Sequence, residues 1–124
     1  MMLRIVIGGL KKDVIERSAK AAGGDKVQVT VTSDFDAAKK IKAGEADYYL
    51  GACNSGGGAA LSVCIGILGY ANCSTVAKNG KKPNPAEIEK LVSEGKIAFG
   101  MSVEGIEEAV PLIVNSLLKK NNLA

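Results

Sequence analysis

Two kinds of hydrophobic pattern alternate along the chain of 124 residues. Short runs rich in β-branched residues are typical of buried strands, and apolar residues spaced by three and four are typical of helices. The patterns predict strands at residues 3–7, 27–32, 47–52, 74–77 and 97–101, and helices at residues 11–22, 34–43, 59–70, 86–93 and 103–120. Strands and helices that alternate in this way indicate a parallel sheet with helices on both faces.

The whole chain, residues 1–124, is therefore expected to form one α/β domain. Its predicted architecture is a three-layer αβα sandwich around a five-stranded, mainly parallel sheet. The flavodoxin-like strand order 2-1-3-4-5 is expected because it is common in chains built from five such units. No particular residue specifies that order.

Residues that begin and end helices support these boundaries. Glycines suited to a helix C-terminus follow the first, second and fourth helices at Gly23–Gly24, Gly44 and Gly95. Ser33 or Asp34 is the candidate N-cap of the second helix, Asn84 of the fourth and Ser102 of the fifth. Two features leave alternatives open. Asn79–Gly80 fits either a two-residue hairpin turn or part of a long loop, and Pro111 is expected to kink the last helix or to split it at Val110.

The loops that follow the strands are expected to share one edge of the sheet, because the carboxyl ends of parallel strands lie together. Glycines, hydroxyl groups and lysines concentrate in these loops. The crevice is expected between the first and third loops. The candidate ligand-binding residues are Gly8, Gly9, Lys11, Cys53, Asn54, Ser55, Gly56, Gly57, Gly58, Lys78, Lys81 and Ser102.

The third loop, residues 53–58 with the sequence CNSGGG, carries the most specific signal. Consecutive glycines let backbone N–H groups approach a ligand closely, and the predicted helix that begins at Ala59 adds the positive end of its dipole. Both features favour an anion. The loop matches neither the Walker A motif nor GxGxxG. The alternative is that the glycines only permit a tight turn and close packing.

Cys53 is the candidate reactive group, because a thiol beneath a helix N-terminus has its thiolate form favoured. A buried structural cysteine is the alternative. Lys78 and Lys81 are either anion partners or solvated surface residues. Asp34 and Asp36 are interpreted as capping and first-turn residues rather than as a metal pair.

Composition excludes several functions. Without histidine there can be no Ser-His triad, no histidine-ligated metal and no phosphohistidine. A net charge of +3 is too mild for a typical nucleic-acid binder. The three cysteines have no CxxC spacing, which indicates reduced thiols. No segment resembles a signal peptide or a membrane span, so a cytoplasmic protein is expected.

The predicted helix from Ala59 to Tyr70 is apolar on nearly all sides. A helix on the surface of a monomer usually has a polar face. This helix therefore favours a homo-oligomer in which a second copy covers it. Burial by other parts of the same chain is the alternative.

Three stretches resemble a known family. They are DYYLGACNSGGGAALS at residues 47–62, IVIGGL at residues 5–10 and GKIAFGMSVE at residues 95–104. They are similar to the YhfU-like family of small glycine-rich bacterial proteins, also described as domain of unknown function 2620. Members are encoded beside a phosphotriesterase-like hydrolase, pyridoxal-phosphate enzymes and a membrane protein thought to be a transporter. The resemblance implies a role in the uptake or breakdown of a small metabolite.

These observations favour a non-enzymatic module that binds a small metabolite carrying phosphate or carboxylate, or that docks on a membrane transporter. One alternative is a small enzyme that uses Cys53 or a lysine such as Lys11, Lys78 or Lys81. Another is a structural subunit of an oligomer. No cofactor, metal ion or nucleic-acid partner is expected.

Overall fold

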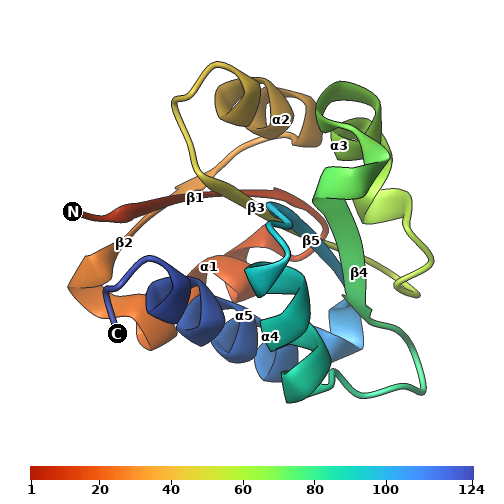
Figure 1. Ribbon diagram of the computed structural model, residues 1–124. Coiled ribbons are helices and arrows are strands. Elements are labelled where there is room, and N and C mark those ends of the chain that lie inside the picture. Colours follow the sequence, from red (N-terminus) through yellow and green to blue (C-terminus); the bar gives the residue numbers. More distant parts are fainter.

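A five-stranded parallel sheet organises the protein, which is described here by a computed structural model covering residues 1–124 (Figure 1). The strands are β1 (Leu3–Gly9), β2 (Val27–Val31), β3 (Tyr48–Cys53), β4 (Cys73–Ala77) and β5 (Ala98–Ser102). The helices are α1 (Lys12–Gly23), α2 (Asp34–Lys42), α3 (Ser62–Leu68), α4 (Pro85–Ser93) and α5 (Ile106–Lys120). The predicted αβα sandwich is confirmed, and each predicted element is present.

The sheet order is β2-β1-β3-β5-β4, so the last two strands are exchanged relative to the predicted 2-1-3-4-5. Burial explains the exchange. All residues of β5 are buried, as a central strand requires, whereas Ser74 and Thr75 of β4 are half-buried. The rule that parallel crossover connections are right-handed supports the same strand order. The chain moves in opposite directions along the sheet after β3 and after β4, so α3 and α4 cover opposite faces (Figure 1).

Two hydrophobic cores lie on the two faces of the sheet. The larger core of 22 residues lies beneath α1, α4 and α5, and α5 supplies seven of its members. The smaller core of nine residues lies beneath α2 and α3 and surrounds the fully buried Tyr49. The smaller core contains alanines and cysteines, which lets α2 and α3 lie close to the strands.

The predicted helix boundaries are largely observed. The hydroxyl of Ser33 accepts a hydrogen bond from Asp36 N–H at 3.1 Å, and Asn84 Oδ1 accepts one from Glu87 N–H at 3.0 Å. The predicted N-caps at Ser33 and Asn84 are therefore formed, whereas the prediction that Ser102 caps the last helix is wrong, because its hydroxyl makes no capping hydrogen bond and α5 begins only at Ile106. The prediction that Pro111 splits the last helix is wrong. Because α5 begins only at Ile106, Pro111 lies in its second turn and removes a single backbone hydrogen bond.

The segment expected to form one helix from Ala59 to Tyr70 is shorter and irregular. A 3-10 turn at Ala59–Leu61 precedes α3, whose seven residues end at Leu68. A helix this short contributes little dipole, so any electrostatic effect at the third loop comes from individual backbone amides rather than from a helix dipole. None of the helices has both the length and the apolar character needed to cross a membrane.

Candidate functional site

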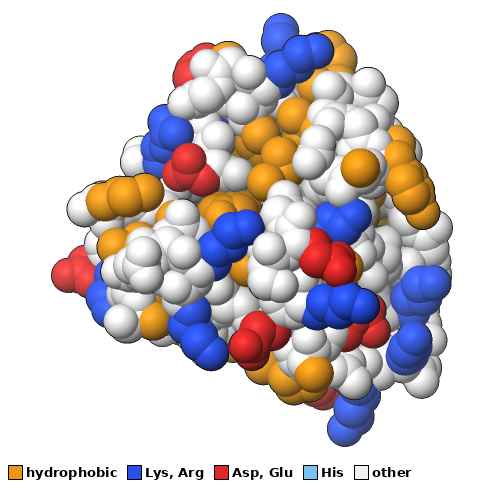
Figure 2. All heavy atoms as spheres, in the orientation of Figure 1, with side chains coloured by type: hydrophobic (Ala, Val, Ile, Leu, Met, Phe, Trp, Pro, Cys, Tyr) orange, Lys and Arg blue, Asp and Glu red, His pale blue; other side chains and the backbone are white.

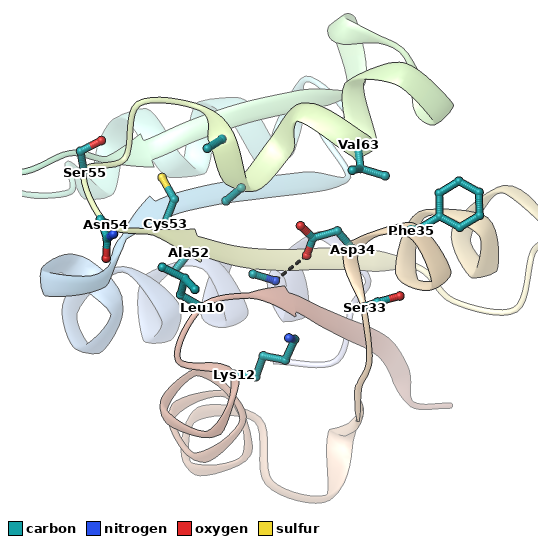
Figure 3. Close-up of a pocket in the computed structure, with 13 residues that line it drawn as sticks. Leu10, Lys12, Ser33, Asp34, Phe35, Ala52, Cys53, Asn54, Ser55 and Val63 are labelled. Carbon is teal, nitrogen blue, oxygen red and sulfur yellow. Dashed lines mark hydrogen bonds between the residues drawn. The ribbon is translucent and has the colours of Figure 1, made fainter.

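The largest cleft, with a volume of about 710 Å³, lies at the carboxyl edge between the ends of β1 and β3 (Figure 3). The connections of these two neighbouring strands leave in opposite directions, which makes this the topological switch point where α/β sheets open a crevice. The cleft is lined by Gly9, Leu10, Lys12, Ser33, Asp34, Phe35, Ala52, Cys53, Asn54, Ser55, Ala59, Ala60 and Val63.

The turn after β1 decides which lysine reaches the cleft. Gly9 has a φ of +73°, and a Cβ there would lie 2.5 Å from the carbonyl oxygen of Ala52. Leu10 N–H then donates to that same oxygen at 2.9 Å. Lys11 follows in the left-handed conformation with a φ of +53°. This turn places Lys12 on the cleft wall, whereas Lys11, the lysine expected there, does not line it.

The glycine loop (residues 53–58) directs backbone amides toward Cys53 at the floor of the cleft. Gly56 N–H donates to Cys53 Sγ at 3.2 Å. Burial by itself raises the pKa of this thiol, but four backbone amides outweigh burial and hold the pKa below its ordinary value. They belong to Ala60, Gly56, Ser55 and Gly57. The loop therefore creates a positive potential that stabilises negative charge at the sulfur.

The other two cysteines have the opposite environment. Burial raises the pKa of Cys64 to about 12 and also raises the pKa of Cys73. Neither residue lines the cleft. Among the three free thiols, Cys53 is therefore the one whose surroundings favour the thiolate.

Asp34 belongs to the cleft and is not the helix cap that sequence reasoning assigned. Its Oδ1 accepts a hydrogen bond from Gly9 N–H, marked in Figure 3, and lies 3.2 Å from the hydroxyl of Tyr49. The Tyr49 hydroxyl also donates to the carbonyl of Ala60 at 2.8 Å. Burial raises the pKa of Tyr49, so its hydroxyl keeps its proton and links Asp34 to the segment that follows the glycine loop.

The remaining predicted residues lie outside this cleft. Gly56, Gly57, Gly58 and Lys78 line a second depression of about 630 Å³, between α3 and β4. Gly8 is buried, and a Cβ there would meet Asp34 and Tyr49. Ser102 is fully buried, and its hydroxyl has no hydrogen-bond partner. The structure thus brings four predicted residues into the cleft: Gly9, Cys53, Asn54 and Ser55.

The lysines after β4 lie on a hairpin. Lys78 and Lys81 pair as an antiparallel bridge around Asn79–Gly80, which settles the open alternative in favour of a two-residue turn. Gly80 N–H donates to Glu104 Oε1 at 2.9 Å, and Asn79 N–H donates to the carbonyl of Ser55 at 3.0 Å. The hairpin therefore supports the glycine loop, and its lysines do not line the cleft.

Hydrophobic side chains form the mouth of the cleft. Phe35 at the start of α2 is 59% exposed, and Leu10 after β1 is 46% exposed. Val63 of α3 lines the same cleft. Figure 2 shows hydrophobic atoms at the surface between α2 and α3. No signal in the sequence identifies these residues, because an exposed apolar residue at a helix start has no distinctive local pattern.

A family comparison covers nearly the whole chain. The model of the family described as "Protein of unknown function DUF2620" matches residues 3–117. The uncharacterised protein YhfU of Escherichia coli strain K12 is 43% identical over 116 residues, which are 94% of this chain and 99% of that protein. YhfU of Shigella flexneri is similar to the same extent, with 43% identity over 116 residues.

Two solved structures have the same fold. The type B ribose 5-phosphate isomerase of Trypanosoma cruzi gives a TM-score of 0.66 at 15% identity, covering 96% of this chain and 84% of that chain. Ribose-5-phosphate isomerase B of Giardia lamblia gives 0.65 at 14% identity, with 94% of each chain covered. Identities this low establish the fold alone.

Proposed function

This chain belongs to the DUF2620 family, whose description states no function, and we propose that it binds a small anionic metabolite of the sugar-phosphate class in the cleft between β1 and β3. The observation that carries the proposal is the hydrogen bond from Gly56 N–H to the sulfur of Cys53 at the cleft floor, at 3.2 Å, together with the lowered pKa that the backbone amides of Ala60, Gly56, Ser55 and Gly57 give this thiol. When Cys53 carries its proton, the positive potential of these amides also favours an anionic group beside the sulfur.

The cleft supports a ligand of this kind in two further ways. Its volume of about 710 Å³ is within the range of small-molecule sites. Lys12 is the one basic side chain in its lining and supplies a positive charge for a phosphate or carboxylate. The names of the two solved structures with this fold refer to ribose 5-phosphate, which makes sugar phosphates the first class to test.

The test measures thermal unfolding with ribose 5-phosphate, inorganic phosphate and, as the uncharged control, ribose. A ligand at a hundred times its Kd stabilises the folded state by about 2.7 kcal/mol, which is an increase of about 10 °C in Tm for a chain of 124 residues. Lys12→Ala should weaken the increase. Lys11→Ala is the matched control, because the neighbouring lysine lies outside the cleft.

Two results would contradict this proposal. One is the absence of any saturable increase with an anionic ligand. The other is an equal loss of the increase in Lys11→Ala and Lys12→Ala, which would mean that general surface charge, rather than the cleft, attracts the anion.

The lowered pKa of Cys53 favours a second candidate, a small enzyme in which this thiolate acts as nucleophile or proton acceptor. The other two cysteines are internal controls, because burial raises the pKa of each. Near pH 7, iodoacetamide should therefore modify Cys53 much faster than Cys64 or Cys73, as measured by peptide mass spectrometry. Equal, slow modification of all three would remove this candidate.

A further inference from the structure

Two charged side chains, Lys12 and Asp34, line the cleft. A carboxylate repels a phosphate or a carboxylate, so Asp34 is unexpected in a site for a bare anion. The structural contacts of Asp34 do not require its charge. The hydrogen bond from Gly9 N–H and the contact with the Tyr49 hydroxyl both involve Oδ1, and a neutral amide oxygen could accept them equally well.

The second carboxylate oxygen of Asp34 is the informative atom. Oδ2 has no hydrogen-bond partner in the chain, and the carboxylate takes part in no ion pair. It does not cap α2, because the side chain of Ser33 does so. The contacts on Oδ1 hold the carboxylate in one orientation, and Figure 3 shows the side chain projecting into the cleft toward the side where Cys53 lies.

We infer that Asp34 is a specificity-determining residue that accepts hydrogen bonds from hydroxyl groups of the ligand. The ligand is then a polyhydroxylated anion, with its charged group near the glycine loop and Lys12 and its hydroxyl groups at Asp34. This inference rests on the proposed function and narrows its ligand class. Chemistry supports it, because a fixed carboxylate oxygen is a strong acceptor for hydroxyl donors.

The position of Asp34 in the fold supports the same role. It is the first residue of α2, shortly after the end of β2 at the carboxyl edge, and its Oδ1 accepts a hydrogen bond from Gly9, the last residue of β1. In doubly wound α/β domains, an acidic residue near the end of the second strand is well placed to bind the hydroxyl groups of a ribose. The sequence here lacks the glycine fingerprint of a dinucleotide site, so a smaller hydroxylated ligand fits better.

The test compares ribose 5-phosphate with n-pentyl phosphate, a ligand with the same phosphate and no hydroxyl groups, by isothermal titration calorimetry. The wild-type protein should prefer ribose 5-phosphate by about 10- to 100-fold. Asp34→Asn should abolish this preference. It should weaken the binding of ribose 5-phosphate. The affinity for pentyl phosphate should be unchanged or higher, because a negative charge is removed.

Asp36→Asn is the matched control. Asp36 lies in the same helical turn, bonds to the Thr32 hydroxyl at 2.7 Å and does not line the cleft. Its substitution should leave the preference unchanged. Because Asp34→Asn also alters a packed site, the wild-type protein is tested in parallel with 2-deoxyribose 5-phosphate, which should bind more weakly than ribose 5-phosphate.

Two results would overturn the inference. The wild-type protein could bind the hydroxylated and alkyl phosphates equally, or Asp34→Asn could weaken both ligands equally, as a purely structural role requires. If the wild-type protein bound neither phosphate, the proposed function itself would fail. Tight binding of pentyl phosphate with no preference for hydroxyl groups would overturn this inference and leave anion binding intact.

Discussion

Substituting the glycines of the 53–58 loop with alanine should have strongly unequal effects, although the residues are adjacent. Gly56 has a φ of +75°, and a Cβ there would lie 2.4 Å from the carbonyl oxygen of Ala77 and 2.8 Å from the Cα of Lys78. Gly58 has a φ of +103° with nothing within 4 Å of a Cβ. One position therefore combines backbone strain with a collision against backbone atoms, and the other has strain alone.

The expected magnitudes follow from these two contributions. A left-handed conformation costs an L-residue about 1–2 kcal/mol, which is the whole effect expected for Gly58→Ala. Overpacking adds about 1–3 kcal/mol, so Gly56→Ala should lower the free energy of unfolding by about 2–5 kcal/mol. For a chain of 124 residues, each kcal/mol corresponds to about 4 °C in Tm. Gly57→Ala, with only a side-chain oxygen 3.2 Å from the new Cβ, should be nearly neutral.

Differential scanning calorimetry of the three variants measures this order directly. Gly56→Ala should also slow the alkylation of Cys53, because it displaces the N–H that donates to the sulfur at 3.2 Å. A cost for Gly58→Ala equal to that for Gly56→Ala would refute the reasoning. So would a destabilised Gly56→Ala protein whose Cys53 reacts at the wild-type rate.

Other substitutions test the scaffold and its surface. Asn84→Ala should cost about 1 kcal/mol in urea unfolding, because α4 loses its N-cap; an unchanged midpoint would contradict this. The hydrogen bond and charge of Arg4 hold the pKa of Asp47 below its usual range. The stability that this interaction gives the folded state is therefore present above about pH 4, the usual pKa of an aspartate. It is lost as the pH falls through the lowered pKa of the folded state. Asp47→Asn should therefore be less stable than the wild-type protein at pH 7, with the difference disappearing in acid; a difference that persists or grows there would be contrary evidence. We also propose that two copies associate through the partly exposed apolar residues of α3. Light scattering should then detect a dimer that Ile67→Lys dissociates, and a wild-type monomer at micromolar concentration would exclude this association.

Local sequence signals were sufficient for most of the fold. The strands and helices follow from hydrophobic spacing, and the caps at Ser33 and Asn84 follow from residue type. Strand order depends on pairing between distant segments, which spacing does not report. The polar residues Ser74 and Thr75 were the signal in the sequence that β4 lies at an edge, and the structure shows both to be half-buried.

The candidate site could be predicted in position but not in composition. Topology alone placed a crevice between the ends of the first and third strands. Lys12 rather than Lys11 lines the cleft because Lys11 adopts a left-handed conformation, which no local sequence pattern predicts. Asp34 follows a capping residue, so its position in the sequence matched a first-turn aspartate. Only the three-dimensional approach of Gly9 and Tyr49 shows that its side chain belongs to the cleft.

The most direct test of the central claim is a titration of ribose 5-phosphate into protein labelled with ¹⁵N at its glycines, followed by the amide signals in NMR spectra. Anion binding in the cleft predicts saturable shifts at Gly9, which lines the cleft, and at Gly56 and Gly57, whose backbone amides act on Cys53 at the cleft floor. Gly44 and Gly95, which follow α2 and α4 at the opposite edge of the sheet, should not shift. The absence of shifts at Gly9, Gly56 and Gly57, or saturable shifts confined to Gly80 in the lysine hairpin, would contradict the assignment of the cleft as the anion site.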